Sequence, residues 1–160
     1  MKKVISIIEK LDLFISSISL IIIISITVAG VIARKFLGTP IAWLEEIQLF
    51  FFVWTVFFAG SVAFRTGNHV GIDIVAERLN PKTRKVLDVI VYIITMLVIL
   101  YLFKGSLDLL SAVTKKVTPY FKISYVYIDA AAPIGCVLMM LQYTILICRK
   151  LMGKEVKEEE

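Results

Sequence analysis

Histidine and cysteine, which often bind metals or act as catalytic groups, are scarce in this chain of 160 residues. It has one histidine, His69, and two cysteines, Cys136 and Cys148. A single histidine cannot supply a bis-histidine haem site, and no Ser-His-Asp, Cys-His or phosphate-binding loop arrangement accompanies it. The cysteines lie more than three helical turns apart in one apolar run, too far for a disulfide within one helix. We expect no cofactor, no metal site and no enzymatic activity.

Charged residues are also few, at 19% of the chain, whereas hydrophobic residues make up 59%. Soluble domains average roughly 25% charged and 45–50% apolar residues, so this composition indicates a membrane protein. Nearly uncharged runs, each long enough for a helix to cross ~30 Å of hydrocarbon, cover approximately residues 13–34, 42–65, 86–110 and 124–149. We predict an all-α integral membrane protein with four transmembrane helices in a single domain, residues 1–153. Residues 154–160 are expected to form a disordered charged tail.

Two polar stretches carry apolar residues at helical spacing, which predicts short amphipathic helices at the membrane surface. One is "GIDIVAERL", residues 71–79, in the longest internal connection. The other, "KKVISIIEKLDLF" at residues 2–14, fits either a surface helix or the first turns of the first membrane helix. The first apolar run is longer than the ~7–15 residues of a signal-peptide core, so we expect it to remain as a membrane helix.

Lysine and arginine are spread unevenly over the connections. Twelve of the 18 lie in residues 2–10, 65–85 and 149–157, and six lie in residues 34–35 and 104–122. The positive-inside rule then predicts that both termini and the middle loop are cytoplasmic. Because these residues sit at helix ends and form no basic stripe, we expect no nucleic-acid partner.

Proline and glycine mark the expected helix ends. Gly38 and Pro40 end the first membrane helix and leave a connection of only a few residues before the second. The third helix is expected to continue to about Leu110. Pro133 has no N–H for the helical ladder, which predicts a kink in the outer third of the last helix.

Two adjacent acids, Glu45 and Glu46, open the second apolar run. At the bilayer centre the pair costs ~5–7 kcal/mol, and the large apolar residues that follow return only ~3–6 kcal/mol. The acids must therefore lie near the outer end of the helix. One interpretation places one acid among the headgroups and pairs the other with Arg34 or Lys35. The other buries one acid against a second subunit or an ion path, because ionisable groups at membrane depth are functional candidates.

Aromatic residues crowd the same run. Trp43 fits an interfacial anchor, whereas Trp54 lies deep in the span. The run is apolar on every side, so some of its aromatic surface must meet lipid or a second protein.

The segment "TPIAWLEEIQLFFFVWTVFFAGSVAFRTGNHVGID", residues 39–73, resembles the signature of the small membrane subunit of tripartite ATP-independent periplasmic (TRAP) transporters. The resemblance rests on a Trp, two Glu, a second Trp, a small-residue pair and an Arg-x-x-x-His run, here Trp43, Glu45, Glu46, Trp54, Ala59, Gly60, Arg65, His69 and Asp73. The stretch "APIGCVLMMLQ", residues 132–142, is also similar to that family. Asp129 departs from the uncharged residue expected just before it.

The resemblance implies a place in the bacterial inner membrane, within a three-part import system. In that family a periplasmic binding protein captures an organic acid, such as a sialic acid or a C4-dicarboxylate, and a large polytopic subunit carries it inward with sodium. The small subunit braces the large one as the stationary scaffold of an elevator mechanism. The implied partners are the large subunit, the binding protein (directly or through the large subunit) and membrane lipids. The implied interface candidates are Trp43, Glu45, Glu46, Trp54, Gly60, Arg65, His69 and Asp73.

Two alternatives come from other classes of protein. A small proton-coupled multidrug transporter acting as a homodimer would need Glu45 or Glu46 near mid-membrane, which the insertion argument disfavours. A membrane anchor for a redox enzyme would need more than the single histidine in a loop.

Overall fold

The computed structural model describes residues 2–38, 41–66 and 81–151, and most of these residues lie in helices. The helices are α1 (Lys2–Leu37), α2 (Ala42–Thr66), α4 (Pro81–Ala112), α5 (Tyr125–Asp129) and α6 (Ala131–Leu151). Four spans are long and apolar enough to cross a membrane: Lys10–Phe36, Ala42–Arg65, Val86–Ala112 and Tyr125–Arg149. The prediction of an all-α protein with four membrane helices is confirmed.

The N-terminal polar stretch belongs to the first membrane helix, because α1 runs unbroken from Lys2. Of the two interpretations of this stretch, the structure therefore favours the first turns of a long helix. The second expected amphipathic helix, at residues 71–79, lies outside the described residues.

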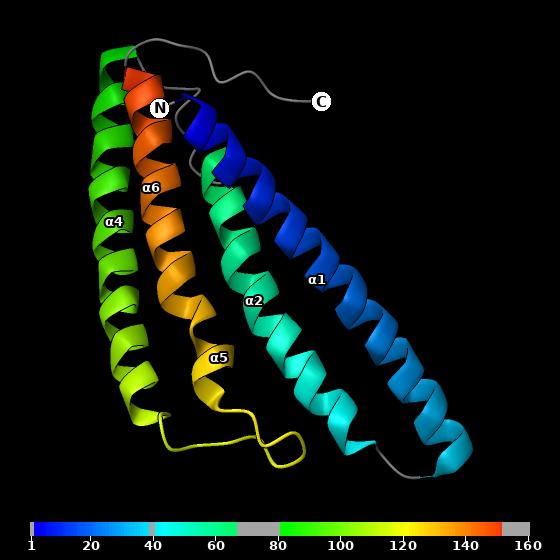
Figure 1. The fold of residues 1–160 in the computed structure, drawn as a ribbon. Helices are drawn as coiled ribbons and strands as arrows, with labels where there is room; N and C mark the ends of the chain where they lie inside the picture. The colour runs from blue at the N-terminus through cyan, green and yellow to red at the C-terminus, as the bar shows by residue number, and fades with distance from the viewer. Residues whose placement is uncertain (1, 39–40, 67–80, 152–160) are drawn as a thin grey trace.

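The four long helices stand in a row in the order α1, α2, α6, α4 (Figure 1). α1 packs on α2, α2 packs on α6, and α6 packs on α4. We call the end where α1 begins and α6 finishes the termini end, and the opposite end, which holds residues 113–124, the loop end. The row is one helix thick, so most helices expose large apolar side chains, and α6 is the best buried.

The contact between α1 and α2 is built on a seam of α1 residues spaced alternately four and three apart. This spacing keeps one face of a helix against its neighbour. The seam consists of Asp12, Ser16, Ser19, Ile23, Ile26, Gly30 and Ala33, of which the first three are buried and the others half-buried. Large apolar residues such as Phe14, Ile21 and Val28 point outward and are exposed. Apart from Ile23 and Ile26, the seam is made of small and polar residues, the types that are enriched where membrane helices pack together.

The contact between α2 and α6 depends on a glycine. A Cβ atom added at Gly135 would lie 2.5 Å from the Cβ of Phe57 and 3.2 Å from its Cα. Only a residue without a side chain lets the two backbones approach this closely. Further along the same contact, the Phe64 ring meets the Tyr143 ring at 5.3 Å between centroids.

The last membrane span is two helices, α5 and α6, with the break at Ala130. Pro133 has no N–H to donate to the carbonyl of Asp129, and its ring crowds that carbonyl. The helical ladder therefore loses a bond there and resumes with Ile134 N donating to Ala130 O at 3.4 Å. The kink expected from Pro133 takes the form of a break three residues before it.

Candidate functional site

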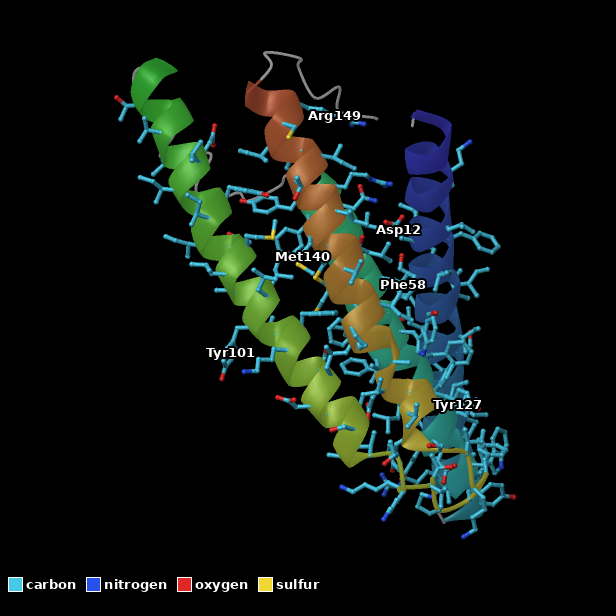
Figure 2. All side chains as sticks on the ribbon, turned by 60° about the vertical axis from the view of Figure 1, so that its left-hand side comes forward. Asp12, Phe58, Tyr101, Tyr127, Met140 and Arg149 are labelled. Carbon is cyan, nitrogen blue, oxygen red and sulfur yellow. The ribbon has the colours of Figure 1, made fainter. Side chains whose placement is uncertain are left out.

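A buried carboxylate, that of Asp12, joins three helices near the termini end (Figure 2). Its side chain lies on α1 and is 1% exposed. Asp12 Oδ2 accepts hydrogen bonds from Ser61 Oγ on α2 at 3.2 Å and from Gln142 Nε2 on α6 at 3.3 Å. Arg65 on α2 places a guanidinium nitrogen 3.7 Å from Asp12 Oδ1. We call Asp12, Ser61, Arg65 and Gln142 the Asp12 cluster.

The Asp12 cluster holds neighbouring helices together. A lone carboxylate in an apolar environment is strongly unfavourable, so its donors and its counter-charge hold it in place. Because those partners come from α2 and α6, the carboxylate fixes the register of three helices at once. Among the described residues, Gln142 Oε1 is buried without a hydrogen-bond partner.

The sequence analysis did not select Asp12, because it placed the first span at residues 13–34, directly after it. The alternating four-and-three spacing from Asp12 through Ser16 and Ser19 to Gly30 was the signal that could have found it. Its partner Arg65 was among the selected residues, and Gln142 closes the second family-like stretch.

Glu46 binds the backbone of a loop at the loop end. Its carboxylate accepts hydrogen bonds from two consecutive backbone N–H groups, those of Tyr120 and of Phe121, the latter at 3.0 Å. Among the described residues, Glu46 thus binds a loop of its own chain and forms no ion pair with Arg34 or Lys35, which lie exposed in the last turn of α1. Glu45 points to the exposed side of α2.

The loop that Glu46 holds, residues 113–124, has a defined conformation. Val117 and Ser124 form an antiparallel bridge. Within it, Thr118 N donates to Ile123 O at 2.8 Å, and Ile123 N donates to Thr118 Oγ1 at 3.2 Å. Lys122 closes the turn with a φ of 56°, in the left-handed region. We call residues 113–124 the lysine loop.

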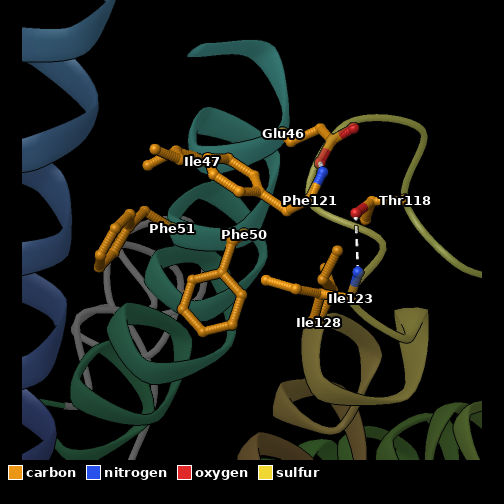
Figure 3. A pocket seen from close by; sticks show the side chains of 8 residues that line it. All are labelled: Glu46, Ile47, Phe50, Phe51, Thr118, Phe121, Ile123 and Ile128. Atoms are coloured by element: carbon orange, nitrogen blue, oxygen red, sulfur yellow. Dashed lines mark hydrogen bonds between the residues drawn. The ribbon is translucent and has the colours of Figure 1, made fainter. Parts of the chain in front are cut away.

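An apolar cavity of about 270 Å³ lies between α2 and the lysine loop (Figure 3). Glu46 and Thr118 stand among its lining residues, and the others are apolar: Ile47, Phe50, Phe51, Phe121, Ile123 and Ile128. Recognition of a polar solute needs several converging polar groups. With both lining polar groups bonded to backbone of the loop, this cavity is not built to bind an organic acid.

Trp54 faces the interior of the row. Its ring stacks between those of Phe50 and Phe58, with centroids 5.7 and 5.4 Å away, and its Nε1–H donates to Tyr127 O at 3.4 Å. Phe52, on the opposite side of α2, is 55% exposed, so part of the aromatic surface does face outward.

The residues selected from the sequence do not gather at one place. Glu46 and Arg65 lie at opposite ends of α2, about 29 Å apart along the helix axis at 1.5 Å per residue. Trp43 and Glu45 are exposed beside Glu46, and Gly60 packs against Met139. His69 and Asp73 lie outside the described residues. In the described part of the chain, no group of three or more His, Cys, Asp or Glu residues could hold a metal ion.

Comparison with known proteins gives consistent matches over most of the chain. A family profile described as "Tripartite ATP-independent periplasmic transporters, DctQ component" matches residues 23–153. The sialic acid TRAP transporter permease protein SiaT of Haemophilus influenzae is 26% identical over 85% of this chain, which spans only 22% of that protein. The ectoine TRAP transporter small permease protein TeaB of Halomonas elongata is 23% identical over 94% of this chain and 79% of its own length. The C4-dicarboxylate TRAP transporter small permease protein DctQ of Rhodobacter capsulatus is 38% identical over 48 residues, 30% of this chain and 21% of that protein.

Proposed function

The chain belongs to the DctQ component family of tripartite ATP-independent periplasmic transporters, and we propose that it is the small membrane subunit that braces a larger, substrate-carrying membrane subunit. The observation that carries this proposal is the one-helix-thick row with its broad apolar faces, in which the cavity beside Glu46, within the described residues, is lined mostly by apolar side chains. Such a layer has surface to offer a partner protein on one face and lipid on the other.

The Asp12 cluster supports a stationary role. A brace must keep its shape while the part that it supports moves, and three helices fixed by one buried carboxylate resist sliding along one another. The close contact at Gly135 adds a second fixed point between α2 and α6.

The orientation that we propose follows the distribution of lysine and arginine. Twelve of the 18 lie in residues 2–10, 65–85 and 149–157, the stretches of sequence next to the helix ends at the termini end, and six lie in residues 34–35 and 104–122, toward the loop end. By the positive-inside rule the termini end lies in the cytoplasm of a bacterial cell, and the loop end faces the periplasm.

The substrate that we propose is an organic acid carried inward with sodium by the large subunit. Relatives of this chain are named for sialic acid, C4-dicarboxylate and ectoine. A brace without a substrate site leaves that choice to the large subunit and the periplasmic binding protein.

Purification of the tagged chain from its native membranes in mild detergent tests this function. We expect a much larger polytopic protein to copurify in a 1:1 ratio. In liposomes, both proteins and the binding protein together should take up the solute, and this chain alone should not.

The homodimeric multidrug transporter gives the opposite result. A homodimer that transports cationic drugs by itself, and loses transport when Glu45 and Glu46 are both replaced by Gln, would overturn the proposal.

A further inference from the structure

The lysine loop contributes three of the basic residues at the loop end. Its 12 residues, 113–124, include Lys115, Lys116 and Lys122 and no acidic residue. All three lysines are exposed. The acid that contacts the loop, Glu46, has both carboxylate oxygens turned toward backbone N–H groups of residues 120 and 121, and it also attracts Lys122. Three lysines against this one carboxylate leave the loop with an excess of positive charge.

The tip of the loop presents aromatic side chains between these charges. Tyr120 is 57% exposed and Phe121 43% exposed, and their rings meet edge to face at 5.2 Å between centroids. Tyrosine is among the residue types that contribute most binding energy at protein interfaces, and charged residues at the rim of an interface speed the approach of a partner of opposite charge.

The loop is held rigid although its tip is exposed. Glu46 fixes the backbone at residues 120 and 121, the Val117–Ser124 bridge closes the base, and the buried Thr118 secures Ile123 (Figure 3). Tyr125 N donates to Lys116 O at 3.1 Å and ties the loop to the start of α5. Fixing a surface in advance lowers the entropy lost when a partner docks.

The position of the loop limits what a soluble partner can touch. The other connection at the loop end, between α1 and α2, consists of residues 38–41 only. A soluble protein that approaches this end of the subunit therefore meets the lysine loop and, beside it, the last turn of α1 (Figure 1).

We propose that the lysine loop is the surface on which this subunit docks an acidic face of the soluble, substrate-loaded binding protein of the tripartite system. This inference rests on the proposed function, which supplies the binding protein and the outward orientation of the loop. Aromatic and basic residues also suit a membrane surface, but a membrane anchor works without a fixed backbone. The three independent restraints on the loop favour a protein partner of defined shape.

Charge reversal in the reconstituted complex tests the inference. In liposomes that contain both membrane subunits, uptake is measured against the concentration of loaded binding protein, at low and at high salt. Replacement of Lys115, Lys116 and Lys122 by Glu should raise the half-saturating concentration about tenfold at low salt, because long-range attraction is lost. The matched Lys→Arg triple variant keeps the charge and should behave as the parent.

Loss of rigidity gives a second test that leaves the lysines in place. Glu46→Ala should raise the half-saturating concentration for the binding protein above that of Glu45→Ala, because both variants lose one negative charge and keep the lysines but only Glu46→Ala frees the tip to move. Glu45→Ala, one residue away and without a bond to the loop, is its control.

Crosslinking identifies what lies on the loop. A photoreactive amino acid in place of Tyr120 should crosslink to the loaded binding protein, whereas one in place of Phe36, an exposed aromatic residue in the last turn of α1, should not. Crosslinks from position 120 only to lipid or only to the large subunit would overturn the inference, as would unchanged half-saturation in the Lys→Glu triple variant.

Copurification separates this failure from failure of the proposed function. If the large subunit copurifies with the Lys→Glu variant and transport is unchanged, only the docking surface is wrong. If the parent chain copurifies with no large subunit, the proposed function itself is wrong.

Discussion

Removal of the Asp12 carboxylate should weaken the row of helices more than any other single change among the described polar residues. In Asp12→Ala, Ser61 and Gln142 each lose an acceptor, and Arg65 loses its counter-charge. Interhelical hydrogen bonds in membranes contribute ~0.6–1.7 kcal/mol each. Breaking a buried ion pair by removing one partner costs ~3–5 kcal/mol when both groups are fully buried. Because Arg65 is 22% exposed, its share is smaller, and we expect a total loss of about 2–4 kcal/mol.

The free energy of unfolding of the purified subunit can be measured by titration with sodium dodecyl sulfate in mixed micelles, followed by tryptophan fluorescence. Ser61→Ala and Gln142→Leu should each cost less than Asp12→Ala. In a double-mutant cycle with Asp12→Asn and Arg65→Gln, the two losses should add to more than the loss in the double variant. Two results would refute the assignment of Asp12 as the group that holds the helices together. One is strict additivity of the two losses, and the other is an Asp12→Ala variant whose free energy of unfolding lies within ~0.5 kcal/mol of the parent's.

Two further predictions concern other contacts. Gly135→Leu should separate α2 from α6 and lower the free energy of unfolding by more than ~2 kcal/mol. At Gly105 an added Cβ meets nothing within 4 Å, so Gly105→Ala should stabilise the subunit by up to ~1 kcal/mol. Equal effects of the two substitutions in the same titration would contradict this prediction. Glu46→Ala should release the lysine loop and speed tryptic cleavage after Lys122 about tenfold in detergent, while Glu45→Ala should leave the rate unchanged. Equal cleavage rates would show that Glu46 does not hold the loop.

The membrane spans could be predicted from the sequence because their signal is local. Long apolar runs and helix breakers such as Gly38 and Pro40 need no knowledge of distant residues. Pro133 likewise predicted an interruption of the last span. The break falls at Ala130, next to Asp129, whose carbonyl receives no hydrogen bond from Pro133.

The contacts that hold the row together could not be predicted in this way. Asp12 has its partners 49 and 130 residues away, and Glu46 binds backbone 74 residues along the chain. A pairing over such separations depends on which helices are neighbours. Short sequence patterns do not predict the order α1, α2, α6, α4. The depth argument placed Glu46 near one end of the second membrane helix, but neither of the two interpretations of its role named the backbone of residues 120 and 121 as its partner.

A row of helices one layer thick has edges, as a β-sheet does, and α1 forms one of them. An edge element has a neighbour on one side only, so it is the first that can peel away. If α1 left α2, it would turn the Asp12 carboxylate toward hydrocarbon without Ser61 and Arg65, and an unpaired charge there is costly. The polar seam thus keeps α1 packed on α2 in an asymmetric way. It adds modest attraction while the two helices are in contact, and it makes the state in which they are separated strongly unfavourable.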